Sequence, residues 1–230
     1  MKVIKGLLAG AAIASMAVTG AVTLTAGPAN ASSCDISHPN ISLRADPQYQ
    51  GYTVNCPAAV NGAYWKIVAA DGYDHGGVGY PDHLSTDYYA DPFDIGGHLG
   101  KYYLYPDGAY DASYNDISSQ QATESFYIKL ASHAYAHGWR SGNWVYLWAY
   151  ASRFNAGANY GLGAFTASTG RKVDFYQYYS GAWHGAGYKY TGGNGDTAAL
   201  KVWAPTKRNF RVYVEPTGTR WGTWGGSIYR

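Results

Sequence analysis

The strongest constraint on the fold is a series of segments between Val145 and Ile228 in which apolar residues alternate with residues of another kind. The four segments are VYLWAYASRF (145–154), KVDFYQYY (172–179), TAALKVWAP (197–205) and NFRVYVEPT (209–217). Successive side chains of a β-strand point to opposite faces, so strict alternation predicts half-buried strands. Short strands separated by Gly- and Pro-rich turns, such as Gly192–Gly195, favour antiparallel sandwiches. We therefore expect an all-β chain with few helices.

The two faces of these predicted strands differ in chemistry. The aliphatic face consists of Val145, Leu147, Ala149, Ala151, Val173, Phe175, Ala198, Leu200, Val202, Phe210, Val212 and Val214. The aromatic face consists of Tyr146, Trp148, Tyr150, Tyr176, Tyr178, Trp203 and Tyr213. We expect the aliphatic face to form the core of a sandwich and the aromatic face to form its outer surface.

The N-terminal segment Met1–Ala31 has the features of a cleaved secretory signal. Lys2 and Lys5 precede an apolar run, and Ala29-Asn30-Ala31 forms a cleavage site of the A-x-A type. The apolar run is nearly long enough to span a bilayer, so an uncleaved membrane anchor is the alternative. The expected location of the mature protein is therefore extracellular, without a membrane span.

The chain has two cysteines, Cys34 and Cys56, which would be exposed to an oxidising compartment after export. We expect them to form a disulfide. In the chain-entropy model, a closed loop of this length stabilises a domain by about 3 kcal/mol.

Residues 32–121 show a weaker form of the same alternation, in the segments 41–45, 52–56, 63–70 and 101–106. A polar stretch between Pro106 and Thr123 is typical of a linker. We therefore predict two tandem β-sandwich domains, an N-terminal one at 32–121 and a C-terminal one at 122–230, in which SFYIKLAS (125–132) is the first strand of the second domain. One sandwich with a long N-terminal extension is the alternative.

Several short motifs follow one another over 125–230. They are Gly142 before Val145 and Leu147, Gly170–Val173, Trp183, Asn194–Thr197, Val202–Pro205, Arg211–Tyr213, and Thr217 or Thr219 near Trp221-Gly222. This order resembles the immunoglobulin-like domains of secreted actinobacterial proteins, many of them without an assigned function. The resemblance implies an immunoglobulin-like sandwich and an extracellular location. It implies no catalytic residues.

Two segments could bind a metal ion, because DGYDHGG (71–77) and DPFDIGG (91–97) share the pattern D-x-x-D-x-G-G. Oxygen ligands on glycine-rich loops suit calcium, and the weak candidates are Asp71, Asp74, Asp91 and Asp94. Neither segment matches the helix–loop–helix calcium motif, and Asp and Gly favour turns for conformational reasons alone. Gly72–Gly79 is accordingly expected to be a turn. We expect no cofactor, with calcium as the alternative.

Histidines and carboxylates supply little further evidence of chemistry. His133 and His137 are four residues apart, which on a strand is about 13 Å and too far for two ligands of one metal. Ser227 follows two glycines but lacks the G-x-S-x-G context of a nucleophile elbow. We therefore predict that the protein is not an enzyme. A small secreted hydrolase with an Asp-based site near 71–94 is an alternative.

The aromatic face is the main candidate site. In an immunoglobulin-like arrangement Trp148 and Trp203 would project from one sheet, and Tyr176, Tyr178 and Tyr213 would come together on the other. Flat rings with polar edges suit sugar rings or another protein, although they could also serve cross-strand pairing or cover the sheet against the neighbouring domain. With a formal net charge of only +2, nucleic acid is not an expected partner. The prediction is a secreted binding protein for a cell-envelope polysaccharide or protein, or else a self-assembling extracellular structural protein that forms homo-oligomers.

Overall fold

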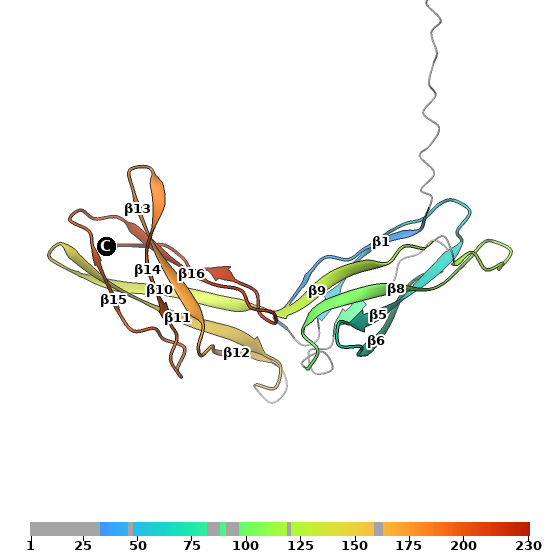
Figure 1. Cartoon of the computed structure of the whole chain (residues 1–230), viewed down its shortest axis with the longest axis horizontal. Coiled ribbons are helices and arrows are strands. Elements are labelled where there is room, and N and C mark those ends of the chain that lie inside the picture. The colour runs from blue at the N-terminus through green and yellow to red at the C-terminus, as the bar shows by residue number, and fades with distance from the viewer. Residues whose placement is uncertain (1–32, 46–47, 82–87, 91–96, 119–120, 159–162) are drawn as a thin grey trace, which may run out of the picture. The chain divides into compact units, whose positions relative to one another are not determined.

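The computed structural model describes residues 33–45, 48–81, 88–90, 97–118, 121–158 and 163–230. Within these ranges the regular structure is β-strand, with no α-helix (Figure 1). The expected all-β fold class is therefore confirmed. The described part holds no helix that is long and apolar enough to cross a membrane. The predicted signal segment 1–31 lies outside the described residues.

A five-stranded sheet is the largest layer formed by the residues before Ala131. Its strands, in spatial order, are β2 (Ile41–Leu43), β9 (Glu124–Leu130), β8 (Gly100–Tyr110), β5 (Gly62–Ala69) and β6 (Asp74–Tyr80). Strand β2 runs parallel to β9, and the other neighbours are antiparallel. Two short antiparallel pairs accompany this sheet: β1 (Asp35–Ser37) with β4 (Thr53–Asn55), and β3 (Gln48–Gln50) with β7 (Tyr88–Ala90).

The strand connections of this part match the immunoglobulin pattern, in which strands C, F and G share one sheet and strands A and B belong to the other. Here β5, β8 and β9 take the places of C, F and G, while β1 and β4 take those of A and B. The core contains fully buried Trp65, Leu104 and Phe126 from the larger sheet. The predicted disulfide between Cys34 and Cys56 is present. It joins the residue before β1 to the residue after β4.

Strand β9 lies elsewhere than the sequence indicated. Residues 125–132 were expected to open the second domain, but β9 pairs with β2 and β8 in the five-stranded sheet. The polar stretch before it connects two neighbouring strands of one sheet, and the backbone N–H of Ile117 donates to the carbonyl of Ala109 at 2.8 Å. The chain passes to the next sheet at Leu130–Ser132. The first sheet thus continues past the expected boundary at residue 121, and the division into separate domains stays a prediction.

Two further sheets form the C-terminal sandwich. In the first, β11 (Trp144–Asn155) pairs with β10 (Ser132–Ser141), β12 (Ala164–Ala167) and β15 (Leu200–Trp203). In the second, β13 (Lys172–Tyr179) pairs with β14 (Ala182–Tyr190) and β16 (Asn209–Val214), and β16 also pairs with β17 (Thr223–Trp224) and β18 (Ile228–Tyr229). These two sheets have the composition A-B-E and C′-C-F-G, which is the immunoglobulin-like arrangement.

The aliphatic face predicted from the sequence is the core between these two sheets. Its buried members include Val145, Leu147, Val173, Phe175 and Phe210, each at most 2% exposed. Ala198 differs from the prediction, because it is exposed and its neighbour Thr197 is buried. The side-chain oxygen of Thr197 accepts a hydrogen bond from the backbone N–H of Ala149 at 3.0 Å, so a polar residue closes this end of the core.

Three segments carry more strand than the sequence indicated. Neither β10 nor β14 was among the segments that the sequence predicted to be strands. The glycine-rich segment after Gly72 forms strand β6, so the turn is confined to the residues before Asp74. Glycine permits this because β6 lies close to β5: a Cβ atom on Gly77 would lie 2.8 Å from the carbonyl oxygen of Trp65.

Candidate functional site

The outward side chains of β10, β11 and β15 form a row of aromatic rings. Residues directly opposite each other on antiparallel strands point to the same face. The register places Tyr135 opposite Tyr150, Trp139 opposite Tyr146, and Trp144 opposite Trp203. We use the name aromatic ladder for seven residues: Tyr135, Trp139, Trp144, Tyr146, Trp148, Tyr150 and Trp203.

Ring contacts join the members of the aromatic ladder in three groups: Tyr135 with Tyr150, Trp139 with Tyr146 and Trp148, and Trp144 with Trp203. The ring of Trp139 stacks on Tyr146 with a centroid distance of 4.8 Å and an interplanar angle of 5°. Trp139 also lies 5.4 Å from Trp148, and Trp144 meets Trp203 edge-to-face at 4.9 Å. The ammonium group of Lys201 lies 4.3 Å from the ring centroid of Trp144. Each such aromatic pair is worth about 0.5–1.5 kcal/mol beyond its buried area, so the rings hold one another in place.

The aromatic ladder remains open to solvent despite these contacts. The exposed fractions are 51% for Tyr135, 48% for Trp139, 50% for Trp203 and 37% for Trp144. Trp148 is half-buried between its neighbours. The placement of Trp148 and Trp203 on one sheet face agrees with the sequence-based expectation. Their role in ligand binding stays a prediction.

The other three predicted residues lie on the outer face of the second sheet. Tyr176 and Tyr213 both contact Trp224, at centroid distances of 5.2 and 4.7 Å, and Tyr178 contacts Trp183 at 5.3 Å. The two sheets enclose one core, so their outer faces look in opposite directions. The five predicted residues therefore belong to two surfaces.

An arginine organises this second surface. The guanidinium carbon of Arg211 lies 4.1 Å from the ring centroid of Trp183 and 3.9 Å from that of Trp224. Arg211 stands directly opposite Tyr176 in the sheet. On this surface one guanidinium group thus lies against two tryptophan rings. In the aromatic ladder Lys201 lies over Trp144 and Tyr146, whereas no cation of the described residues lies over Trp139, Trp148 or Trp203. We take the aromatic ladder as the better candidate site.

The sequence prediction missed Tyr135, Trp139 and Trp144 in the aromatic ladder, and Trp183, Trp224 and Arg211 on the opposite surface. A signal for the first group existed, because His133, Tyr135, His137 and Trp139 alternate with smaller residues. This alternation was not recognised as a strand, since the inward positions are Ala134, Ala136 and Gly138 and carry little hydrophobicity.

The acidic residues proposed for calcium are engaged in turns where they are described. The carboxylate of Asp71 accepts from the ring nitrogen Nδ1 of His98 at 2.8 Å and from the backbone N–H of Tyr73 at 3.1 Å. The hydrogen bond from His98 is the main cause that lowers the pKa of Asp71. Asp74 accepts from the backbone N–H of Gly76 at 2.9 Å.

No group of three His, Cys, Asp or Glu side chains in the described ranges is arranged to hold a metal ion. Asp91 and Asp94 lie outside those ranges, so calcium binding stays untested. His133 and His137 both belong to β10, on a strand as the spacing argument assumed, and they contact Phe165 and Trp148 at centroid distances of 3.8 and 5.3 Å.

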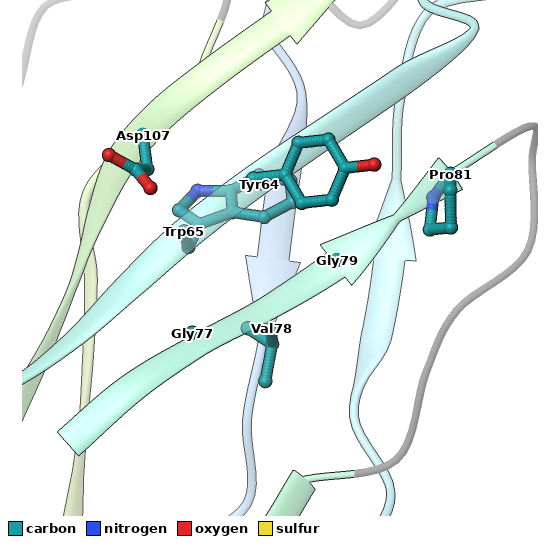
Figure 2. A pocket seen from close by; sticks show the side chains of 7 residues that line it. All are labelled: Tyr64, Trp65, Gly77, Val78, Gly79, Pro81 and Asp107. Carbon is teal, nitrogen blue, oxygen red and sulfur yellow. The ribbon is translucent and has the colours of Figure 1, made fainter.

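A shallow pocket of about 420 Å³ lies on β5 and β6 in the N-terminal part (Figure 2). Figure 2 shows the ring of Tyr64 beside β6 near Gly79, with Asp107 toward one end of the pocket and Pro81 toward the other. The carboxylate of Asp107 lies 3.4 Å from the ammonium group of Lys66. The pocket thus offers one exposed ring, that of Tyr64, and one carboxylate, that of Asp107, which is paired with Lys66.

No protein family matches this chain, and no curated protein matches it either. Solved structures that are similar at low identity include the following two. One is described as a tetra-tandem repeat in the extending region of a large adhesion protein, with 11% identity, 86% of this chain covered and a TM-score of 0.34. The other is the D00-D0 domain of intimin, with 12% identity, coverage of 84% of this chain and 98% of that one, and a TM-score of 0.27.

The chain spans 49% of the adhesion-protein repeat structure. The TM-scores are low, so the assignment of an immunoglobulin-like fold rests on the strand pairing described above. The resemblance to secreted actinobacterial proteins stays a prediction. Neither similarity bears on what this chain binds.

Proposed function

We propose that this protein acts outside the cell as a binding protein, and that the aromatic ladder binds a polysaccharide. One observation carries the proposal: seven aromatic side chains cover one sheet face, and Tyr135, Trp139 and Trp203 are each about half exposed. Soluble proteins seldom leave a large apolar patch exposed without a use for it.

The physical basis is the match between flat aromatic rings and sugar rings. Tyrosine and tryptophan combine a large apolar face with an O–H or N–H group at the edge. Side chains on one face of a strand recur about every 7 Å along it, so the aromatic ladder offers several stacking positions in succession. A polymer can contact several positions at once, and its affinity then exceeds that of a single sugar unit.

An extracellular site of action is supported by the Cys34–Cys56 disulfide. Disulfides persist in oxidising compartments and are rare in the cytosol. The predicted signal segment points in the same direction. A purely binding role, without catalysis, is part of the proposal. A hydrolase centred on Asp71 is less favoured, because the Asp71 carboxylate is held by His98 and by the turn backbone.

Self-assembly is the second candidate, because the same exposed rings could make contacts between copies of the chain. The two functions differ in the concentration dependence of particle size. Assembly through the aromatic ladder predicts a size that rises with protein concentration in light scattering and that falls in Trp139→Ala. Polysaccharide binding predicts a monomer of constant size without ligand.

The test compares two tryptophans that have the same exposure on opposite faces. Trp139 and Trp224 are both 48% exposed. Wild-type protein, Trp139→Ala and Trp224→Ala are titrated with a panel of neutral and charged polysaccharides, and binding is followed by calorimetry. We expect Trp139→Ala to weaken binding at least tenfold and Trp224→Ala to leave it within twofold. Equal losses in the two variants, or no binding to any polymer, would refute the proposal.

A further inference from the structure

A groove opens beside Trp203, at the edge of the aromatic ladder. It exists because β13 and β14 (orange in Figure 1) continue past the last core residue. The inward face of β13 carries buried Val173 and Phe175 and then Gln177 and Tyr179. Gln177 stands opposite buried Phe210, which confirms that it lies on the core side of the sheet.

The groove has a volume of about 580 Å³. Gln177, Tyr179 and Arg208 line it from β13 and from the residue before β16, and Lys201, Trp203 and Pro205 line it from β15 and the following turn. Pockets that bind small ligands typically measure about 300–1,000 Å³, so the groove has room for a sugar unit. Trp203 belongs to both the groove and the aromatic ladder, and one polymer chain could contact both.

The groove is cationic. Its charged lining residues are Lys201 and Arg208, and no carboxylate of the described residues lines it. Arg208 donates to the side-chain oxygens of Gln177 and Thr206, each at 3.2 Å, and its guanidinium carbon lies 5.1 Å from the ring centroid of Tyr179. Lys201 lies against Trp144. Neither cation forms an ion pair with a described acidic residue.

The net charge of the surrounding chain adds to the positive potential of the groove. Residues 132–230 contain eleven Lys and Arg but only three Asp and Glu, for a formal net charge of +8. Residues 32–131 contain four Lys and Arg against twelve Asp and Glu, for a formal net charge of −8. Two of the three acidic residues of the C-terminal half, Asp174 and Glu215, are paired with Lys172. Such a distribution attracts an anion toward the C-terminal half and repels it from the N-terminal half.

We infer that the groove between β14 and β15 binds an anionic sugar unit, one that bears a carboxylate, phosphate or sulfate group. The ring of the sugar stacks on Trp203, and the anionic group accepts hydrogen bonds from Arg208 and Lys201. The planar guanidinium group donates in a fork that matches such oxyanions. This inference rests on the proposed function and defines its ligand as an acidic polysaccharide.

The acidic N-terminal half of a second copy is another conceivable occupant, in view of its opposite charge. The groove favours a polysaccharide because two of its walls are the rings of Trp203 and Tyr179, each partly exposed, and these walls continue into the aromatic ladder. Binding of a second copy of the chain in this groove would overturn the inference, and the experiment below detects it.

The test uses one polymer backbone with different substituents. Dextran, carboxymethyl-dextran, phosphorylated dextran and dextran sulfate are titrated into the protein at constant ionic strength. We expect at least one charged derivative to bind about tenfold or more tightly than neutral dextran, since hydrogen bonds to charged groups contribute that much. Comparison of the three derivatives identifies the anionic group that the groove prefers.

Variants locate the effect in the groove. Lys201→Gln combined with Arg208→Gln should remove most of the preference for charged derivatives over neutral dextran. Lys207→Gln is the matched control, because Lys207 is exposed beside Arg208 and does not line the groove. It should retain more than half of the wild-type affinity. Urea unfolding midpoints establish that all variants are folded.

Four results would overturn the inference. Equal affinity for neutral and charged derivatives would refute it while leaving the proposed function intact, whereas no perturbation by any polysaccharide would refute the proposed function as well. A loss in Lys207→Gln as large as that in the double variant would show diffuse attraction without a site. Sedimentation that reveals a salt-sensitive dimer, abolished by Arg208→Gln, would assign the groove to a second copy of the chain.

Discussion

Replacement of Arg211 by glutamine tests the distinction between the two aromatic surfaces. Arg211 lies between Trp183 and Trp224, with distances of 4.1 and 3.9 Å from its guanidinium carbon to the two ring centroids. Its Nε atom is buried and has no hydrogen-bond partner among the described residues. A third ring, that of Tyr176, lies 5.9 Å from the guanidinium carbon. Glutamine keeps a polar side chain but loses these cation–π contacts.

The expected loss follows from the number of contacts. A cation–π contact is worth about 0.5–1 kcal/mol at an exposed site and about 2 kcal/mol when desolvated. The two short contacts, to Trp183 and Trp224, on a half-buried residue give a loss of about 1–3 kcal/mol in the free energy of unfolding. For a domain of 150–250 residues, each kcal/mol lowers Tm by roughly 2–4 °C.

Urea unfolding of Arg211→Gln, Trp224→Leu and the double variant measures the coupling directly. We expect the two substitutions to interact by about 1 kcal/mol, because both remove the same contact. Polysaccharide binding should be unchanged in Arg211→Gln, since this surface faces away from the aromatic ladder. A coupling near zero would show that the ring contacts of Arg211 do not stabilise the fold. A large loss of binding in Arg211→Gln would show that the ligand binds the surface around Arg211 and not the aromatic ladder.

Three further predictions concern stability. Removal of the Cys34–Cys56 disulfide, by reduction or by a double Cys→Ser change, should lower the free energy of unfolding by about 3 kcal/mol, and equal urea midpoints with and without reductant would contradict this. Gly195 has φ +84°, and a Cβ atom there would lie 2.7 Å from the carbonyl oxygen of Ala151, so Gly195→Ala should cost more than about 1 kcal/mol; Gly193→Ala, with open space around it, is the control in the same thermal melt. The hydrogen bond from His98 lowers the pKa of Asp71 in the folded protein, so its stabilisation is present above the usual Asp pKa of about 3.9 and is lost as pH falls through the lowered value. Asp71→Asn should therefore flatten the decline of stability below about pH 4 in urea titrations, and an unchanged slope would refute the assignment.

The central strands were predictable because their inward faces are strongly aliphatic. Residues 172–179 form β13 over the predicted bounds, and 145–154 lie within β11. Strand β14 escaped prediction for a physical reason: it is an edge strand with Gly185, Ala186 and Gly187 near its centre, so it supplies little hydrophobic alternation. Strand β9 has the expected alternation, but alternation does not state which sheet a strand joins.

The candidate site was predictable in part. The order of strands in an immunoglobulin-like sandwich was enough to place Trp148 and Trp203 on one face. Trp139 was missed because the inward residues of β10 are small. The contacts of Arg211 with two tryptophan rings and the groove beside Trp203 depend on strand register. This includes the irregularity in β13–β14 pairing between Phe175 and Tyr176. Register of this kind is set by tertiary packing and is not visible in a single sequence.

The most direct measurement of the central claim is an NMR spectrum of protein in which only the tryptophan indole nitrogens are labelled. The chain has eight tryptophans. Four belong to the aromatic ladder: Trp139, Trp144, Trp148 and Trp203. We predict that a bound polysaccharide shifts or broadens these four indole signals and leaves those of Trp65, Trp183, Trp221 and Trp224 in place. Perturbation of Trp183 and Trp224 with the aromatic ladder signals unchanged would contradict the account.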